Sequence, residues 1–204
     1  MVTLYHCKGA RSLRPLWALE EIGVAYRLEM LPFPPRVFAK EFLGINPLGT
    51  IPYFVDGPVK MTESSAICQY LVEKFGPTDL KVYPGEGDYG AYLNWLYHSD
   101  ATLTFPQTIV LRYTRLEPEA RRLPQAVADY GAFFLGRLKL LDAALEDGRS
   151  FLVADRFTIA DIAIGYALIL AESLKLDDRF SDRIKAYLVG LKERPGYQRA
   201  AAKE

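Results

Sequence analysis

Side chains that can bind an anion or activate a nucleophile gather in two stretches near the start of the chain. They are Tyr5, Cys7, Arg11 and Ser12 in LYHCKGARS (4–12), and Glu63 and Ser64 in TESSAICQYL (62–71). Each stretch lies where a short β-rich run gives way to an apolar helical pattern. A helix N-terminus attracts anions through its free amides and its dipole, so the hydroxyls of Ser12 and Ser64 either help to hold an anion or simply cap a helix. The residues alone leave both interpretations open.

The two cysteines, Cys7 and Cys68, form neither a disulfide framework nor a zinc-binding spacing. Cys7 is not part of a CxxC pair, although the neighbouring Lys8 favours its thiolate. Cys68 falls on the apolar side of a predicted helix and is expected to be inert core. This use of cysteine, with no apolar signal core at the N-terminus, predicts a cytoplasmic protein.

The charge balance narrows the class of partner. The 204 residues carry 25 Lys and Arg against 25 Asp and Glu, which implies no basic face and argues against nucleic acid or an anionic membrane as a partner. Half of the residues are apolar, which is enough for a sizeable core. No apolar run approaches the length of a membrane span.

Strand and helix signals alternate in the first part of the chain. The expected elements are strands at 2–6, 25–31, 51–55 and 59–61, and helices at 12–23, 36–46 and 62–76. The first three elements form a parallel β-α-β crossover, and the last two strands form a hairpin around Asp56-Gly57. Pro52 is interpreted as a turn entering a strand, at a bond where a cis peptide is accessible.

The signal changes between Gly76 and Gly87, a stretch rich in Gly and Pro without periodicity that predicts a linker. Everything after it is helical. The expected helices lie at 88–116, with a bend at Pro106, and at 126–148, 157–174, 180–193 and 195–203. Thr158 and Asp161 form a capping-box pattern before a helix that is apolar nearly all round, so this helix is predicted to be buried.

Three motifs in order along the chain resemble the glutathione transferase superfamily. They are NPLGTIP (46–52), TESSAICQYL (62–71) and FTIADI (157–162). The resemblance implies an α/β thioredoxin-like N-terminal domain over 1–77 that binds glutathione, and an all-α C-terminal domain over 85–204 that carries a pocket for an electrophile. It also implies glutathione as co-substrate, a small electrophilic second substrate, and a homodimer.

The resemblance also implies roles for residues of the glutathione site. The segment Thr50-Ile51-Pro52 would pair with the cysteinyl backbone of glutathione, as a strand pairs at a sheet edge. Glu63 would accept from the γ-glutamyl ammonium, and Ser64, with the amides of its helix, would hold the γ-glutamyl carboxylate. Arg11 would add positive potential near the sulfur.

Three residues compete to act on the thiolate. Serine-type members of the family use a hydroxyl at the position of Ser12, and tyrosine-type members use one at the position of Tyr5. Some bacterial members carry a cysteine where this chain has Arg11, and its absence argues against their cysteine mechanism. We place Ser12 first, Tyr5 second and Cys7 third.

Conjugation of glutathione to a small hydrophobic electrophile is therefore the expected function. Two alternatives stay open: glutathione-dependent thiol–disulfide exchange through Cys7, and a non-catalytic module that binds glutathione or a partner. The electrophile pocket is expected along an apolar wall. This wall comprises Tyr97, Phe105, Leu111 and Tyr113, with Leu13 and Leu31.

Overall fold

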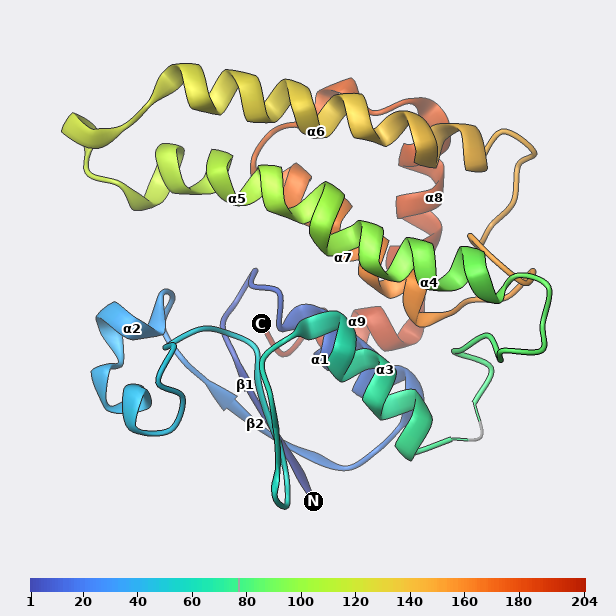
Figure 1. The fold of residues 1–204 in the computed structure, drawn as a ribbon, viewed down its shortest axis with the longest axis horizontal. Helices are drawn as coiled ribbons and strands as arrows, with labels where there is room; N and C mark the ends of the chain where they lie inside the picture. The colour runs from blue at the N-terminus through green and yellow to red at the C-terminus, as the bar shows by residue number, and fades with distance from the viewer. Residues whose placement is uncertain (77) are drawn as a thin grey trace. The chain divides into compact units, whose positions relative to one another are not determined.

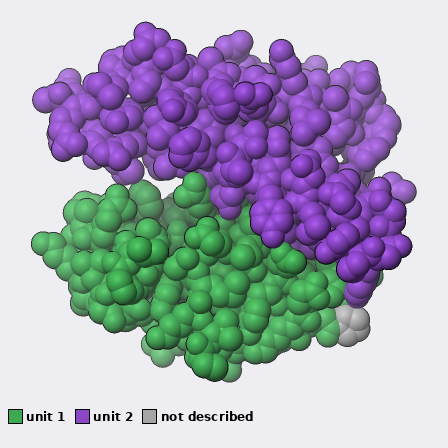
Figure 2. Space-filling model, in the orientation of Figure 1, with its two compact units in different colours: residues 1–81, 192–204 green, residues 82–191 purple. Residues whose placement is uncertain are grey.

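The computed structural model describes residues 1–76 and 78–204 and contains two compact units. The first unit comprises residues 1–81 and 192–204, and the second comprises residues 82–191 (Figure 2). The expected domains, 1–77 and 85–204, therefore differ from the compact units at the C-terminal end, where residues 192–204 pack with the first unit. Residue 77, the expected end of the first domain, lies outside the described residues.

A four-stranded mixed sheet forms the centre of the first unit. Its strands are β1 (Val2–His6), β2 (Tyr26–Met30), β3 (Tyr53–Asp56) and β4 (Val59–Met61), in the order β2-β1-β3-β4. Strands β1 and β2 are parallel because α1 (Leu13–Ile22) crosses over between them, and β3 is antiparallel to both of its neighbours (Figure 1). This is the thioredoxin-like arrangement expected for the first part of the chain.

The two faces of the sheet are covered differently. Helices α1 and α3 (Ser64–Lys74) pack on each other, and Leu4 and Trp17 are fully buried. On the opposite face, the expected helix at 36–46 is broken into α2 (Pro35–Phe38) and the 3₁₀ turn η1 (Lys40–Gly44). The break falls at Ala39, whose φ of −140° is not helical, and Phe42 then packs into an aromatic cluster on this face.

The C-terminal helix α9 (Pro195–Ala201) packs on α1. The guanidinium of Arg194 donates two hydrogen bonds of 2.9 Å to the Glu21 carboxylate, and Arg199 donates to Glu20 at 3.0 Å. A Cβ at Gly196 would lie 2.4 Å from the Glu21 side chain, so the helix approaches at a glycine. These paired charges explain why the last residues belong to the first unit.

The second unit begins with α4 (Tyr89–His98), which continues through the π-helical segment η2 (Ser99–Thr104), α5 (Phe105–Leu111) and a second π-helical segment, η3 (Arg112–Leu116). The sequence predicts one helix with a bend at Pro106. Proline has no N–H to give to the carbonyl four residues earlier, so the bonding pattern widens here. The amide of Phe105 accordingly donates to the Asp100 carbonyl, five residues back.

The remaining helices are α6 (Pro124–Ala144), α7 (Ile159–Ser173) and α8 (Asp182–Lys192), with 3₁₀ turns η4 (Glu119–Arg121) and η5 (Asp177–Arg179). Helix α7 is buried nearly all round, and its capping box is confirmed. The Asp161 carboxylate accepts from the amides of Thr158 and Leu152 at 2.9 Å each and from the Tyr187 hydroxyl at 2.8 Å. Among the described residues, no helix has the length and apolar character that crossing a membrane requires.

Candidate functional site

The loop between β1 and α1 carries a serine hydroxyl that caps no helix. Ser12 immediately precedes α1, and its side chain is buried and makes no capping bond. Instead its Oγ accepts a hydrogen bond from the backbone N–H of Cys7 at 3.3 Å. Within the part of the chain that the structure describes, the hydrogen of this hydroxyl has no acceptor. The Ser12 hydroxyl therefore keeps an uncommitted hydrogen, although its side chain is as fully buried as that of Cys7.

The Cys7 thiol lies in the same loop but in an unreactive setting. Its side chain is buried, and its Sγ donates to the Pro32 carbonyl at 3.6 Å. Burial raises the pKa of the Cys7 thiol to about 12. Because the thiolate is the nucleophile, a thiol with so high a pKa is a poor nucleophile at neutral pH.

Tyr5 lies in β1 and is part of an aromatic cluster. Its ring centroid lies 5.2 Å from that of Phe42 and 5.8 Å from that of Tyr53. Residue alternation in a strand places Tyr5 on the face of the sheet opposite Leu4. The ring therefore has a packing role, which holds whether or not its hydroxyl meets a ligand.

A buried arginine joins the start of α1 to the start of α3. Arg14 is fully buried, and its Nη1 donates to the Oγ of Ser64, the first residue of α3, at 2.9 Å. Glu63, directly before Ser64, makes no capping bond with its exposed side chain. A guanidinium and a helix N-terminus thus coincide, and both stabilise a negative charge.

Sequence reasoning missed Arg14. The available signal was a cation in the otherwise apolar stretch LRPLW (13–17), where a buried charge requires a partner. Arg14, two residues after Ser12 in the sequence, thus links the start of α1 to Ser64, which is far away in the sequence.

The NPLGTIP loop is organised by Asn46, a second residue that sequence reasoning missed. Its buried side chain donates to the Thr50 carbonyl at 2.9 Å and accepts from the Leu48 amide at 3.2 Å. Gly49 has a φ of 57°, and a Cβ there would lie 2.7 Å from the Cβ of Arg36, so only glycine fits. The loop leads into Ile51.

The Ile51-Pro52 peptide bond is cis, as expected, and Phe33-Pro34 is a second cis bond that was not anticipated. The amide and the carbonyl of Ile51 have no hydrogen-bond partner among the described residues. They are therefore free to pair with the backbone of an extended peptide.

Known proteins share both the sequence pattern and the fold. The family model for the glutathione S-transferase N-terminal domain matches residues 1–73. Glutathione S-transferase 3 of Schizosaccharomyces pombe is 26% identical over 100% of this chain and 88% of its own length. The crystal structure of a glutathione transferase from Methylococcus capsulatus has a TM-score of 0.85 at 28% identity, covering 100% of this chain and 98% of its own.

Residues 1–73 belong to the glutathione S-transferase N-terminal domain family, and the whole chain is similar to glutathione transferases in sequence and fold. The fold is also shared with the glutathione transferase URE2P8 from Phanerochaete chrysosporium, solved with oxidized glutathione. That structure has a TM-score of 0.84 at 22% identity and covers 99% of this chain and 94% of its own.

Within this glutathione transferase fold, the predicted site residues differ in where they lie and in how far they are buried. Ser12, Ser64 and the Thr50–Pro52 segment present polar groups at loop ends and helix starts. Arg11, next to Ser12, is half-buried, and Glu63 is exposed. Cys7 is buried in an apolar setting.

The residues expected to form an apolar wall differ in their exposure. The side chains of Tyr97 and Phe105 are 60% and 53% exposed, whereas Leu13 is 1% exposed. Leu13 is the first residue of α1 and faces the core of the first unit, so it contributes little to any open surface.

Proposed function

We propose that the chain is a glutathione transferase enzyme that binds glutathione on its first unit, stabilises the thiolate and transfers it to a small hydrophobic electrophile. One observation carries the proposal. The Ser12 hydroxyl, with an uncommitted hydrogen, lies two residues before the buried Arg14, which bonds Ser64 at the start of α3. A hydroxyl that can donate a hydrogen bond to a thiolate and an arginine that reaches the carboxylate site are thereby placed at the start of one helix, α1.

The chemistry of the site fits glutathione. The γ-glutamyl carboxylate matches Ser64 and the N-terminal amides of α3, with the Arg14 charge behind them. The exposed Glu63 supplies an acceptor for the γ-glutamyl ammonium. The open backbone of Ile51, preceded by Thr50 and followed by Pro52, suits the cysteinyl amide and carbonyl. The oxidized glutathione in the Phanerochaete relative supports the same class of ligand.

Thiol activation is assigned first to Ser12. Lowering the pKa of a thiol by one unit requires about 1.4 kcal/mol of preferential thiolate stabilisation. One hydroxyl donor and a nearby helix N-terminus supply about that much. Arg11 adds positive potential beside Ser12, and Tyr5 is the second choice as donor.

Thiol–disulfide exchange through Cys7 is the weaker candidate. Such a reaction needs an accessible thiolate, whereas the Cys7 thiol is buried and burial raises its pKa to about 12. The high pKa of the Cys7 thiol favours conjugation over exchange, whereas burial alone does not separate the two, because Ser12 is equally buried.

Assembly and location form part of the same proposal. The family relationship supports a homodimer that works in the cytoplasm, with glutathione and a small electrophile as its partners. Light scattering at micromolar concentration tests the dimer directly, and the mass of a monomer would contradict it.

Turnover of an aryl halide with glutathione tests the activity. Wild type should form the thioether, Ser12→Ala should slow turnover about tenfold or more, and Cys7→Ala should retain it. Tyr5→Phe should have a smaller effect than Ser12→Ala. Glutathione binding without turnover of any electrophile would make the chain a binding module, and disulfide reduction that depends on Cys7 would make it an exchange enzyme.

A further inference from the structure

Glu204, at the end of the sequence, reaches the loop that carries Ser12. Its Oε1 accepts a hydrogen bond from the backbone N–H of Gly9 at 2.9 Å. Gly9 lies between β1 and α1, three residues before Ser12, and the C-terminus lies near this end of the first unit (Figure 1). The proposed function gives the Glu204 carboxylate no role.

The same carboxylate oxygen also meets a buried histidine. Oε1 of Glu204 lies 3.2 Å from Nε2 of His6, whose side chain is fully buried. Neither ring nitrogen of His6 makes an aligned hydrogen bond in the part of the chain that the structure describes. A buried polar group in that state is costly, and the Glu204 carboxylate is within reach to satisfy it. His6 therefore favours keeping the carboxylate at this place.

That one oxygen joins the start of the loop to its turn. His6 ends β1, and its carbonyl accepts from the Leu31 amide at 2.8 Å, which fixes the strand end. The turn comes at Gly9, whose φ of 67° is left-handed, and the Ala10 amide closes it by donating to the Cys7 carbonyl at 3.1 Å. The carboxylate holds this turn against the strand end from outside the loop.

The turn is connected to the Ser12 hydroxyl by short steps. The Cys7 amide donates to the Oγ of Ser12 at 3.3 Å, and the Ala10 carbonyl accepts from the Leu13 amide, the first of α1, at 3.0 Å. A shift of the turn therefore moves the groups that fix the hydroxyl. Since misplacing a catalytic group by about 1 Å can cost about 100-fold in rate, even a small loosening of this loop is measurable.

The segment that carries Glu204 is anchored separately. The ammonium of Lys203 donates to the Tyr26 hydroxyl in β2 at 2.7 Å and pairs with the Glu20 carboxylate of α1. The Glu204 amide donates to the Ala201 carbonyl at 3.2 Å, which closes a turn after α9. The carboxylate is thus brought to the loop by a fixed support within the first unit.

We propose that Glu204 is a positioning residue for thiol activation. Its carboxylate, seated against His6, holds the Gly9 amide and thereby sets the place of the Ser12 hydroxyl. Glu204 acts through the loop and does not contact the glutathione sulfur. The inference rests on the proposed function, because the loop has this purpose only where Ser12 donates to the thiolate.

Thiolate absorbance of the glutathione complex as a function of pH tests the proposal, together with kcat and KM for turnover of an aryl halide. Glu204→Ala should raise the pKa of the bound thiol by about half a unit, which leaves about a third of the thiolate at a pH below that pKa. The kcat value should fall about threefold there, while KM for glutathione stays within about twofold of wild type. A change in folding stability alone does not move the thiol pKa, because it is read from the complex.

Two further variants and a double variant sharpen the test. Glu204→Gln keeps an oxygen for the Gly9 amide and should recover most of kcat. Glu193→Ala is the matched control, since it removes an exposed carboxylate from the same C-terminal stretch, and it should behave as wild type does. In a Ser12→Ala background, Glu204→Ala should add nothing to the thiol pKa, because the effect passes through the Ser12 hydroxyl.

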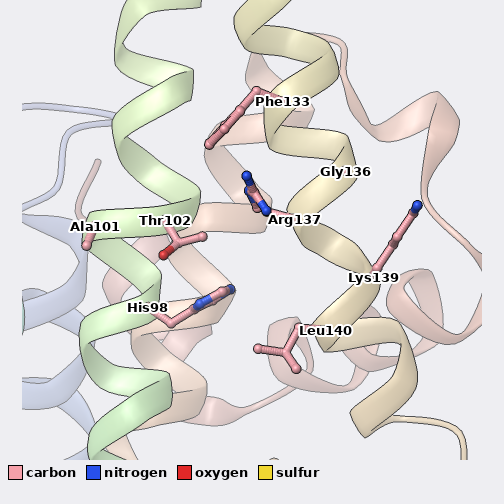
Figure 3. Close-up of a pocket in the computed structure, with 8 residues that line it drawn as sticks. All are labelled: His98, Ala101, Thr102, Phe133, Gly136, Arg137, Lys139 and Leu140. Carbon is pink, nitrogen blue, oxygen red and sulfur yellow. The ribbon is translucent and has the colours of Figure 1, made fainter.

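Proton NMR of the imidazole C–H groups checks the contact itself, since the chain has two histidines, and His98→Gln assigns their signals. Glu204→Ala should shift the His6 signals. The signals of His98 should stay unmoved, because that residue lies in the second unit, at a cavity of about 630 Å³ between the α4–η2 stretch and α6 (Figure 3).

Unmoved His6 signals overturn the inference. A Glu204→Ala variant that keeps the thiol pKa and kcat of wild type, while Ser12→Ala changes both, overturns it as well. The same holds if Glu204→Ala shifts the thiol pKa equally with and without the Ser12 hydroxyl. If the thiol in the wild-type complex titrates as that of free glutathione does, the proposed function is wrong, and the inference falls with it.

Discussion

The helix starts in the two units use similar side chains in opposite ways. At α7, in the second unit, the Thr158 hydroxyl accepts from the Ala160 amide at 3.2 Å, and Asp161 returns a bond to the Thr158 amide. At α1 and α3, in the first unit, Ser12 and Ser64 lie at helix starts, yet no side-chain bond caps either helix. Their oxygens accept from Cys7 and Arg14 instead.

This difference separates structural from functional hydroxyls. A capping box satisfies orphan amides within the protein and leaves nothing for a ligand. At α1 the amides of Leu13 and Arg14 donate to the carbonyls of Ala10 and Arg11, so what is left over at this helix start is the hydrogen of the Ser12 hydroxyl. We therefore expect substitutions at α7 to change stability, and substitutions at α1 and α3 to change binding and turnover.

The largest expected effect is on the stability of the second unit. Asp161→Ala removes a fully buried carboxylate and strands the donors that it satisfies, which should cost about 3 to 4 kcal/mol of unfolding free energy. Thr158→Ala should cost about 1 to 2 kcal/mol. Urea denaturation measures both, with the exposed Asp182 in the first turn of α8 changed to Ala as control. If either variant lost affinity for glutathione while its unfolding free energy stayed unchanged, the separation of structural from functional helix starts would be wrong.

The pH dependence of stability tests the same carboxyl. Burial raises the pKa of Asp161 to about 6, above the value of about 3.9 in an unfolded chain. The native state therefore holds an extra proton between those values, and the resulting stabilisation, present below about pH 4, is lost as pH rises through 6. The unfolding free energy of wild type relative to Asp161→Asn should fall over this interval. A flat difference would contradict the raised pKa.

Ser64→Ala should weaken glutathione binding by about 1 to 3 kcal/mol, because a charged ligand group loses a hydrogen-bond partner. Unfolding free energy should change less than for Asp161→Ala. Calorimetry with glutathione gives the affinity, and Glu63→Ala should weaken binding by a similar mechanism at the ammonium. If both Ser64→Ala and Glu63→Ala bound glutathione as tightly as wild type, the two residues would have only a structural role.

Ser12→Ala should raise the pKa of the bound glutathione thiol by about one unit, equivalent to about 1.4 kcal/mol. Affinity for glutathione should stay nearly the same, because the donor serves the thiolate more than the thiol. Thiolate absorbance of the complex as a function of pH provides the measurement. If Tyr5→Phe produces the larger shift, the tyrosine takes the role that we assign to Ser12.

The smallest effect is expected at Cys7. Since burial raises its pKa to about 12, alkylation by iodoacetamide at pH 8 should be far slower than for a free thiol. Native mass spectrometry follows the reaction, and denatured protein gives the reference rate. Rapid labelling of Cys7 in the folded chain would return thiol exchange to consideration.

Local patterns predicted the elements well where neighbours in sequence determine the structure. The hairpin at Asp56-Gly57 and the Thr158–Asp161 capping box depend on residues within a few positions of one another. The helix expected at 36–46 was broken because burial of Phe42 against Tyr5 and Tyr53 depends on a sheet that pattern reading does not place.

The candidate site was predictable in its residue types but not in its bonding. A serine at a helix start gives the same sequence signal whether its hydroxyl caps the helix or accepts from a loop amide. The partner of Ser64, Arg14, lies 50 positions away, and its apolar surroundings in LRPLW indicate a buried cation but not the residue with which it pairs. Which hydroxyl is free is a property of tertiary structure.

Long-range pairing at the C-terminus bears on how the chain folds during synthesis. Glu20 and Glu21 on α1 meet Arg199 and Arg194 across 179 and 173 positions. The sheet and α1 leave the ribosome early, but Glu20 and Glu21 lack these two arginine partners until the last helix emerges. The unit that starts the chain is thus the last to be completed, so its early half must stay soluble while the intervening helical unit is made.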